Sequence, residues 1–528
     1  MLLSLLRRTP SSIRQLRSFS NVSSQNHQSQ MQAQTLAHSR ERGLRILFFG
    51  SDRFSALSLK ALVDHSSLSL PPPPADTSSQ TPGSDPDARR RATRPIASIE
   101  VVIKQSDSQR QSKRGGVADR TLPVTQLLDR LRSPASARVA RDAAVTGSLL
   151  VAPTHDQNAQ RDELAEFYND SSVAQVAKLA LSETTAVSVN VPTHNAPANA
   201  ATDPIWDGWS FATASGRLFP MSDAEIAAAA VKASKADEHY DAYPFDLGVV
   251  ISFGAMIPER VLRSFRLGAI NIHPSLLPKY RGAAPIHRAI MAGDTETGVS
   301  ILTVTPHKFD VGSILLQKHA PLPVQFSATE AVASLGRLGA QMLTECIQNL
   351  PAYLANSTPQ AQKGGVMARK LTPDTSYLNF TNPAAQIANQ CRALVGTVFT
   401  PRAMYEDKVV MLHNLFLLGL NPRPSWAPDV SLQTFHDCLV AQHAKAKLPG
   451  QPQATQPPGT IVFDNKHELL YVVCGDNQVV AIDGVTFEKR SKQSAPQFFH
   501  GYMTKALAAG RRPQFSALDG SMLAKPSV

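Results

Sequence analysis

The chain has few cysteines, and they stand far apart. Four occur in 528 residues, none of them in a short pair: Cys346, Cys391, Cys438 and Cys474. Small disulfide-rich folds and structural zinc sites both depend on closely spaced cysteines. The sequence therefore predicts neither a disulfide framework nor a bound metal.

Long apolar runs are also missing. The longest, such as residues 247–253, have the length of a strand, whereas a membrane-spanning helix needs about 20 apolar residues.

The turn after the first apolar segment has Gly50 but no GxGxxG pattern, which a dinucleotide site would require. We therefore expect no membrane segment and no nicotinamide cofactor.

Acidic residues are absent before Glu41. The same stretch is rich in serine and glutamine and contains five arginines: Arg7, Arg8, Arg14, Arg17 and Arg40. This composition is typical of a mitochondrial presequence. We expect residues 1–42 to be a transit peptide with a disordered lead, and the protein to reach the mitochondrial matrix; a merely disordered basic tail is the alternative.

Basic residues exceed acidic ones over the whole chain. The formal net charge is +11 and the sequence pI is about 9.5. A polyanionic partner such as RNA suits this balance. The arginines of the presequence contribute to the figure, so the charge alone is a modest signal.

Strand and helix patterns alternate over residues 43–351. Apolar runs predict strands at 45–50, 99–103, 245–253, 271–273, 299–304 and 313–317. Helical spacing of apolar residues appears at 54–63, 283–291 and 328–350. This order predicts an α/β domain with a Rossmann-like, mainly parallel sheet. Residues 69–94 and 133–240 break the pattern and are expected to be long inserts.

A second domain is expected at residues 367–528, after a polar linker at 352–366. Short strand candidates lie at 409–420, 460–463, 469–473, 479–482 and 485–487. Many short strands predict a small β-barrel. Residues 421–459 are rich in proline and glutamine and are expected to form another insert.

The most informative motif is Asn-Ile-His-Pro-Ser-Leu-Leu-Pro at residues 271–278. Asn271 and His273 would lie on the same side of a strand, because strand side chains alternate. Pro274 then ends the strand. Ligand sites in open α/β sheets form where strands end at their carboxyl edge. The motif therefore predicts a functional site at this strand end.

With Arg281-Gly282, Phe309-Asp310-Val311-Gly312 and Phe487-Glu488-Lys489-Arg490, this motif resembles the folate-dependent formyltransferases, and among them the methionyl-tRNA formyltransferases of mitochondrial type. The resemblance implies transfer of a formyl group from 10-formyltetrahydrofolate to the α-amino group of methionyl-tRNA, for mitochondrial translation initiation. It also implies an OB-like C-terminal barrel that helps to hold tRNA. We take a monomer as the default.

The resemblance assigns the catalytic roles to Asn271, His273 and Asp310. Formyl transfer needs a stabilised oxyanion and a proton that moves from the attacking nitrogen to the departing one. An asparagine amide can donate to the oxyanion, a histidine can exchange a proton near neutrality, and an aspartate can orient the imidazole. Taken singly, each residue could instead be structural, as a turn asparagine, a core histidine or a capping aspartate.

Folate contacts follow from the same resemblance, at Ser275, Leu276, Leu277, Pro278, Arg281 and Gly254. An apolar lining with a few polar groups suits a flat heterocycle, although the two leucines could simply pack. The basic loop at 109–116 resembles the family loop that enters the tRNA acceptor end, with Arg110, Lys113 and Arg114 as the expected phosphate contacts. A solvated surface loop is the alternative there.

Two rival functions remain open. One is another folate-dependent formyltransferase, acting on a glycinamide ribonucleotide or a sugar amine. The segment 281–286 and the C-terminal domain argue against the glycinamide type, and the lack of a second enzymatic domain argues against the sugar type. The other rival is a non-catalytic RNA-binding protein that keeps the fold, which should not bind formyl-folate.

Overall fold

The computed structural model describes residues 43–50, 52–67, 96–104, 193–196, 210–213, 215–232, 242–361, 364–419, 427–446, 456–488 and 490–516. The described residues up to 268 belong to one compact unit and those from 269 onward to a second. Within these residues, no helix has the length and apolar character needed to cross a membrane.

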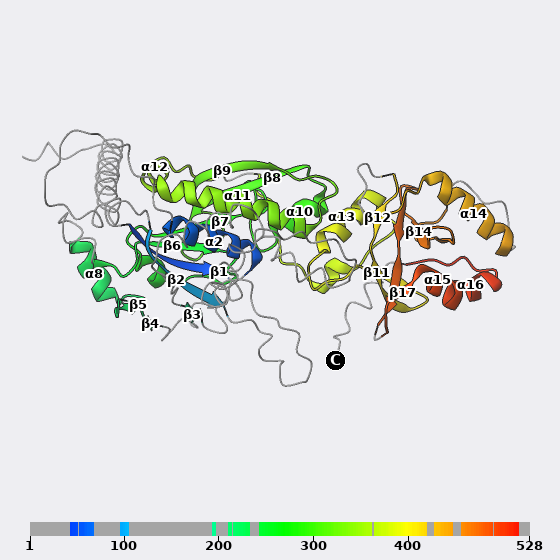
Figure 1. The fold of residues 1–528 in the computed structure, drawn as a ribbon, viewed down its shortest axis with the longest axis horizontal. Helices are drawn as coiled ribbons and strands as arrows, with labels where there is room; N and C mark the ends of the chain where they lie inside the picture. Colours follow the sequence, from blue (N-terminus) through cyan, green and yellow to red (C-terminus); the bar gives the residue numbers. More distant parts are fainter. Residues whose placement is uncertain are drawn as a thin grey trace, which may run out of the picture. The chain divides into compact units, whose positions relative to one another are not determined.

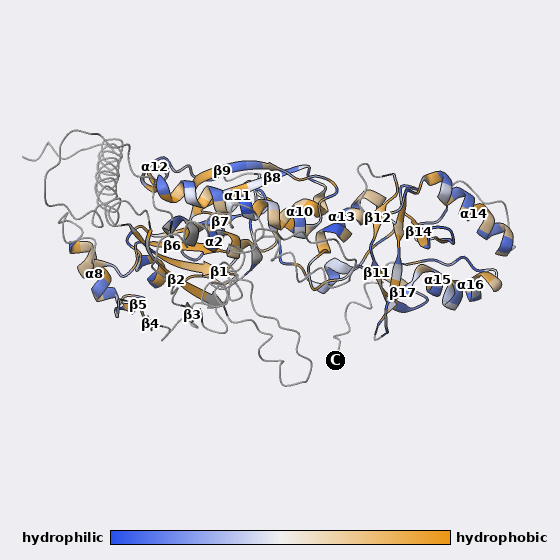
Figure 2. Ribbon diagram, viewed as in Figure 1, coloured by the Kyte–Doolittle hydropathy of each residue, from blue (hydrophilic) through white to orange (hydrophobic). Residues whose placement is uncertain are grey.

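The first unit contains a parallel sheet with the strand order β3-β2-β1-β6. Its strands are β1 (Leu44–Gly50), β2 (Ile96–Lys104), β3 (Thr193–Ala196) and β6 (Leu247–Ile251). The pairs β1–β2, β1–β6 and β2–β3 are all parallel, and helix α2 (Arg53–Ser67) packs against β1 and β2 (Figure 1). Figure 2 shows β1 and β2 as strongly hydrophobic strands. The predicted α/β class with a mainly parallel sheet is thus confirmed.

Part of the predicted insert at 133–240 is ordered against the core. It contains β4 (Phe211–Ala212), β5 (Leu218–Phe219) and α8 (Asp223–Lys232). The ring of Phe219 is fully buried and lies 5.2 Å from that of Phe245 and 5.4 Å from that of Phe265. These aromatic contacts, rather than a local pattern, hold the segment in place. The short helix α9 (Glu259–Arg263) follows in the same unit.

The second unit begins with three antiparallel strands, β7 (Ala269–His273), β8 (Glu296–Thr303) and β9 (Ile314–Pro321). Helices α10 (Pro285–Ala292), α11 (Ala328–Gln348) and α12 (Leu350–Ala355) accompany them. A capping box of Ser327 and Glu330 opens α11, because each side chain satisfies a free backbone N–H of the other. The apolar face of α11 packs against β8 and β9.

The C-terminal domain contains two four-stranded antiparallel sheets, with the orders β10-β11-β16-β17 and β12-β15-β14-β13. Their strands are β10 (Arg402–Tyr405), β11 (Lys408–His413), β12 (Phe416–Leu417), β13 (Ile461–Asp464), β14 (Leu469–Val473), β15 (Val479–Ile482), β16 (Gly484–Phe487) and β17 (Gln493–Ser494). The helical segments are η5 (Pro373–Ser376), α13 (Ala384–Leu394), α14 (Leu432–Ala446), α15 (Ala495–Phe498), η6 (Phe499–Met503) and α16 (Thr504–Ala508).

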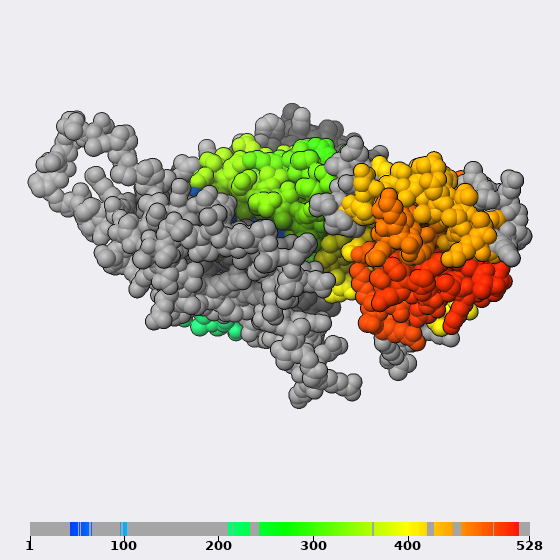
Figure 3. Space-filling model, turned by 45° about the vertical axis from the view of Figure 1, so that its right-hand side comes forward, coloured from blue at the N-terminus to red at the C-terminus, as the bar shows by residue number. Residues whose placement is uncertain are grey.

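Both sheets contribute to one apolar core, in which the ring of Tyr405 lies 5.0 Å from that of Phe498 and 5.9 Å from that of Phe515. This arrangement agrees with the small β-barrel that the sequence predicts. Figure 3 shows the domain as a closely packed body, coloured yellow to red.

Helix α13 joins this domain to the β7–β9 region. It packs against α10, and the Arg392 guanidinium donates to the carbonyl oxygen of Phe326 at 2.8 Å. Leu394 shares an apolar cluster with Ala284 and Leu371. The C-terminal domain is therefore anchored beside the helix that follows the 271–278 motif.

His287 on α10 provides a test of this packing by pH. Burial, and next the cation of Arg288, lower the pKa of His287, and its buried Nδ1 has no hydrogen-bond partner among the described residues. The folded protein holds this ring neutral, whereas the unfolded chain takes up its proton near pH 6.5. Stability should therefore fall as the pH decreases below about 6.5, until the lowered folded-state pKa is passed.

We expect the Tm of a His287→Gln variant to fall less between pH 7 and pH 5 than the Tm of the unmodified chain. Thermal unfolding at the two pH values measures the difference. The exposed His319, which faces Glu296 on the neighbouring strand, serves as the control in a His319→Gln variant. If the Tm of the unmodified chain and that of His287→Gln fall equally with pH, protonation of His287 does not cause the loss of stability.

Candidate active site

Asn271 and His273 lie on the same side of β7, as the alternation of strand side chains requires. On the neighbouring strand β8, Leu302 lies opposite Asn271 and Ser300 lies opposite His273. His273 is 5% exposed, whereas Asn271 is only partly buried. The two side chains therefore leave the strand together, with the imidazole enclosed and the amide closer to solvent.

Asp310 meets both of them from the loop between β8 and β9. Its Oδ1 accepts a hydrogen bond from the Asn271 amide at 3.0 Å and lies 3.5 Å from Nδ1 of His273. Its Oδ2 accepts from the backbone N–H of Gly282 at 2.9 Å. The structure thus brings the three predicted catalytic residues into one cluster, although Asp310 follows Asn271 by 39 positions in the sequence.

Both ring nitrogens of His273 face oxygen atoms. Nε2 lies 2.8 Å from the carbonyl oxygen of Tyr280, which can only accept, so Nε2 must carry a hydrogen. Nδ1 faces the Asp310 carboxylate. A second proton at Nδ1 would form an ion pair with Asp310, so this atom is placed to take up and release a proton.

The Asn271 amide has one N–H group to spare. One of its two N–H groups donates to Asp310. Among the described residues, the second N–H group has no acceptor. The hydrogen bond to Asp310 orients the amide group. A partly exposed, pre-oriented donor of this kind is what a developing oxyanion requires.

The loop that carries Asp310 is held at its base. Thr303 and Ser313 exchange hydrogen bonds, from Thr303 N to Ser313 O at 2.9 Å and from Ser313 N to Thr303 Oγ1 at 3.0 Å. A Cβ atom at Gly312 would lie 1.7 Å from the carbonyl oxygen of Thr303, so only glycine fits. Asp310 itself adopts a φ of +56°, which aspartate tolerates better than most residues.

Gln360 supports the same loop from a distant part of the chain. Its amide nitrogen donates to the carbonyl oxygens of Asp310 at 2.9 Å and Gly312 at 2.8 Å. Its amide oxygen accepts two hydrogen bonds from the Arg281 guanidinium, at 3.0 and 2.7 Å. Sequence reasoning missed Gln360, because no local pattern marks a residue 50 positions from its partner.

The predicted folate residues after β7 form a tightly braced turn. Ser275 is fully buried, and its hydroxyl donates to the carbonyl oxygen of Lys279 at 2.7 Å. The Ser300 hydroxyl donates to the carbonyl oxygen of Ser275 and accepts from the N–H of Leu277. The side chain of Ser275 therefore supports the turn, while Leu276 and Pro278 are only half-buried.

Asp294 and the segment 366–368 secure the rest of this turn. The Asp294 carboxylate binds the Lys279 ammonium at 2.6 Å and accepts from the Tyr280 hydroxyl at 2.9 Å. Burial, and next this contact with Asp294, raise the pKa of Tyr280, so its hydroxyl remains a donor. Arg281 pairs with Met367, and a Cβ at Gly282 would approach the carbonyl oxygen of Ala368 to 2.8 Å.

The remaining predicted contacts are Gly254 and three basic residues. Gly254 belongs to the first unit and has a φ of +68°, which favours glycine. Arg110, Lys113 and Arg114, the predicted tRNA contacts, lie outside the described residues.

The large apolar side chain of Phe309 is 57% exposed beside Asp310. The sequence analysis did not predict this exposed apolar side chain.

Comparisons with known proteins agree with the order of these domains. Residues 173–347 match the family described as "Formyl transferase", and residues 370–503 match "Formyl transferase, C-terminal domain". The mitochondrial methionyl-tRNA formyltransferases of Homo sapiens and Bos taurus are 30% and 31% identical over 259 residues. That overlap is 49% of this chain and 60% of each relative.

The methionyl-tRNA formyltransferase of Enterococcus faecalis is 29% identical over 48% of this chain and 71% of its own length. The solved structure of HypX from Aquifex aeolicus in complex with tetrahydrofolic acid is 15% identical, with a TM-score of 0.33, over 54% of this chain and 42% of that one. A TM-score this low supports no conclusion about the site.

The two domain matches follow each other along the chain and together cover both the cluster at the end of β7 and the paired antiparallel sheets. The curated relatives point the same way, although the chain spans only about 60% of the length of the mammalian ones. The chain belongs to the formyltransferase family.

Proposed function

We propose that this protein transfers a formyl group from 10-formyltetrahydrofolate to the α-amino group of methionyl-tRNA. The observation that carries the proposal is the cluster of Asn271, His273 and Asp310, joined by a 3.0 Å hydrogen bond and a 3.5 Å contact. The names of the curated relatives support the choice of substrates. A free amide donor, a proton-exchanging imidazole and an orienting carboxylate are the groups that acyl transfer needs.

The reaction forms one C–N bond and breaks another. The methionyl amine attacks the formyl carbon, the bond from that carbon to the folate nitrogen breaks, and one proton passes from the attacking nitrogen to the departing one. The spare N–H of Asn271 would stabilise the oxyanion, and His273 would hold the proton at Nδ1 beside Asp310. The products are formylmethionyl-tRNA and tetrahydrofolate.

The remaining assignments belong to the same proposal. Residues 1–42 direct the protein to the mitochondrial matrix, where it serves translation initiation as a monomer. Residues 43–351 carry catalysis, 352–366 link the domains, and 367–528 help to hold tRNA. The gap between the two family matches, from 347 to 370, supports that linker. Folate lies against the turn at Ser275, Leu276, Leu277, Pro278 and Arg281 and near Gly254, while tRNA contacts Arg110, Lys113 and Arg114.

The test is a transfer assay with labelled 10-formyltetrahydrofolate. Methionyl-tRNA, a glycinamide ribonucleotide and a nucleotide-linked amino sugar are offered separately to the full-length chain. Formylation of methionyl-tRNA alone supports the proposal. Formylation of another amine would favour a different branch of the family, and tRNA binding without any transfer would favour the non-catalytic alternative.

Gln360 should affect turnover more than substrate binding. We expect both Gln360→Ala and Gln360→Glu to lower kcat by about 10- to 100-fold, because a small displacement of a catalytic group is costly. Glutamate keeps the Arg281 contact but cannot donate to the carbonyl oxygens of Asp310 and Gly312. Steady-state kinetics with methionyl-tRNA measure the effect, with the exposed Gln433→Ala as control; full activity in Gln360→Glu would show that the Asp310 loop does not depend on this residue.

A further inference from the structure

A small pocket in the C-terminal domain lies between α14 and the segments around residues 456–460 and 512–513. Helix α14, gold in Figure 3, lies on the outside of this domain. Phe435, Leu439 and His443 form its buried face, and the ring of Phe435 lies 6.0 Å from that of Tyr471. This packing makes the helix a fixed wall of the pocket, although it belongs to the region predicted as the insert 421–459.

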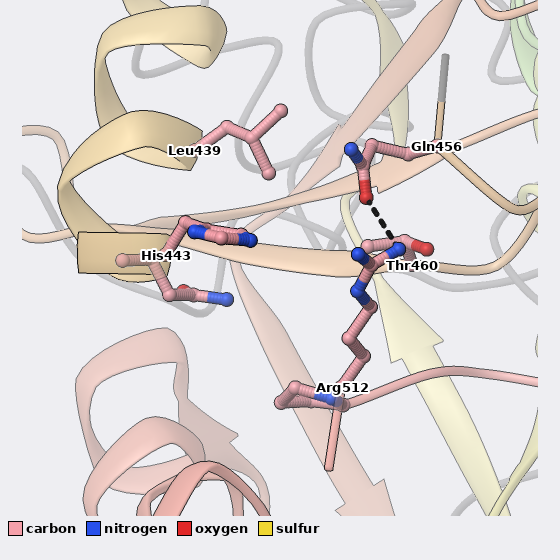
Figure 4. Close-up of a pocket in the computed structure, with 7 residues that line it drawn as sticks. Leu439, His443, Gln456, Thr460 and Arg512 are labelled. Carbon is pink, nitrogen blue, oxygen red and sulfur yellow. Dashed lines mark hydrogen bonds between the residues drawn. The ribbon is translucent and has the colours of Figure 1, made fainter. Parts of the chain in front are cut away.

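His443 brings an unsatisfied polar atom into the pocket. Its side chain is 7% exposed, and its buried Nε2 has no hydrogen-bond partner among the described residues. Figure 4 shows the imidazole directed across the pocket toward Arg512 and Gln456. A buried polar atom without a partner destabilises the folded state. A site that keeps such an atom points to a group that satisfies it.

Arg512 supplies a cation at the same place. One N–H of its guanidinium donates to the amide oxygen of Gln456 at 3.2 Å, and no carboxylate lies within ion-pair distance of it among the described residues. The preceding residue differs, because Arg511 pairs with Glu406 at 3.6 Å. Arg512 therefore has donors and a positive charge available at the mouth of the pocket.

Among the described lining residues, Arg512 supplies the only charge, and two of the polar side chains around it already make hydrogen bonds. The Gln456 amide oxygen already accepts from Arg512, and the Thr460 hydroxyl donates to the carbonyl oxygen of Pro457 at 2.7 Å. A cationic ligand would be repelled by Arg512. The ligand must instead accept hydrogen bonds and carry negative charge, and a planar guanidinium is well suited to a tetrahedral oxyanion.

The size of the pocket limits how much of the ligand can enter. The enclosed volume is about 10 Å³, which is close to the smallest cavity that holds one water-sized atom. We propose that the pocket binds one phosphate group, with a single oxygen inserted between His443 and Arg512 and the remaining oxygens toward solvent. The phosphate could belong to an RNA backbone or to a small phosphorylated molecule.

Thermal unfolding of the full-length chain tests the phosphate chemistry. Sodium phosphate should raise Tm above the value in sodium chloride of equal ionic strength, because a ligand that binds only the folded state stabilises it. Arg512→Gln and His443→Leu should lose that extra rise. Leucine continues the apolar face of Leu439, so the second variant should remain folded. Arg511→Gln removes the same charge one residue away and should keep the rise.

Binding of uncharged tRNA at several salt concentrations identifies the source of the phosphate, without depending on formyl transfer. If the pocket holds an RNA phosphate, Arg512→Gln should reduce the slope of log affinity against log salt by about 0.9, and Arg511→Gln should reduce it less. A Tm effect without a slope effect would assign the pocket to a free phosphate group. An identical phosphate response in all four proteins would overturn the proposal and leave only a general salt effect.

Discussion

Replacement of His273 by alanine should lower formyl transfer about 100- to 10,000-fold, the range that general acid–base groups contribute. The ring is 5% exposed and fixed at both nitrogens, by the Tyr280 carbonyl oxygen at 2.8 Å and the Asp310 carboxylate at 3.5 Å. Alanine has no group that can hold the proton in transit. Because the imidazole is enclosed by the turn, the loss should appear mainly in kcat, with little change in KM for either substrate.

The matched control is His319→Ala, which removes an exposed histidine of β9 from its contact with Glu296. Its rate should stay within about twofold of the unmodified chain, as is usual for a surface change far from a site. Thermal unfolding of both variants separates a catalytic loss from a folding defect. A folded His273→Ala protein that retains more than about a tenth of its activity would remove His273 from the proton path.

Asp310→Asn should lower the rate about 100- to 1,000-fold, comparable to the loss of one preorganised electrostatic group. The carboxylate accepts at both oxygens, from Asn271 at Oδ1 and from Gly282 at Oδ2. An asparagine must present its NH₂ group to one of these two donors. The Asn271 amide would then lose its orientation, or the turn at Gly282 would lose its support, and a proton taken up at Nδ1 of His273 during transfer would lose its counterion.

The same substitution should reduce stability by about 1–3 kcal/mol, the cost of a buried donor left without an acceptor. Denaturant unfolding measures this cost, and single-turnover formyl transfer measures the chemical step. Asp374→Asn, at an exposed aspartate in the C-terminal domain, is the control for a simple change of charge. If Asp310→Asn transfers formyl groups as fast as that control, the aspartate is a structural turn residue.

Where a pattern is local, the sequence predicted the structure closely. The apolar run at 45–50 and the helical spacing at 54–63 correspond to β1 and α2, and the periodic residues of 328–350 form α11 and the start of α12. Helices α13 and α14 were missed. The stretch 421–459 reads as a proline- and glutamine-rich insert, yet α14 buries Phe435, Leu439 and His443 at intervals of four residues.

The sequence by itself determined the strands, the amphipathic helices and the placement of Asn271 and His273 on one face of β7, because these features depend on side-chain periodicity over a few residues. Only the tertiary structure decided that Asp310 accepts from Gly282, that Gln360 braces the Asp310 loop, and that His443 faces Arg512. These contacts join residues 28, 50 and 69 positions apart. They are set by how the chain packs as a whole, and no short segment carries that information.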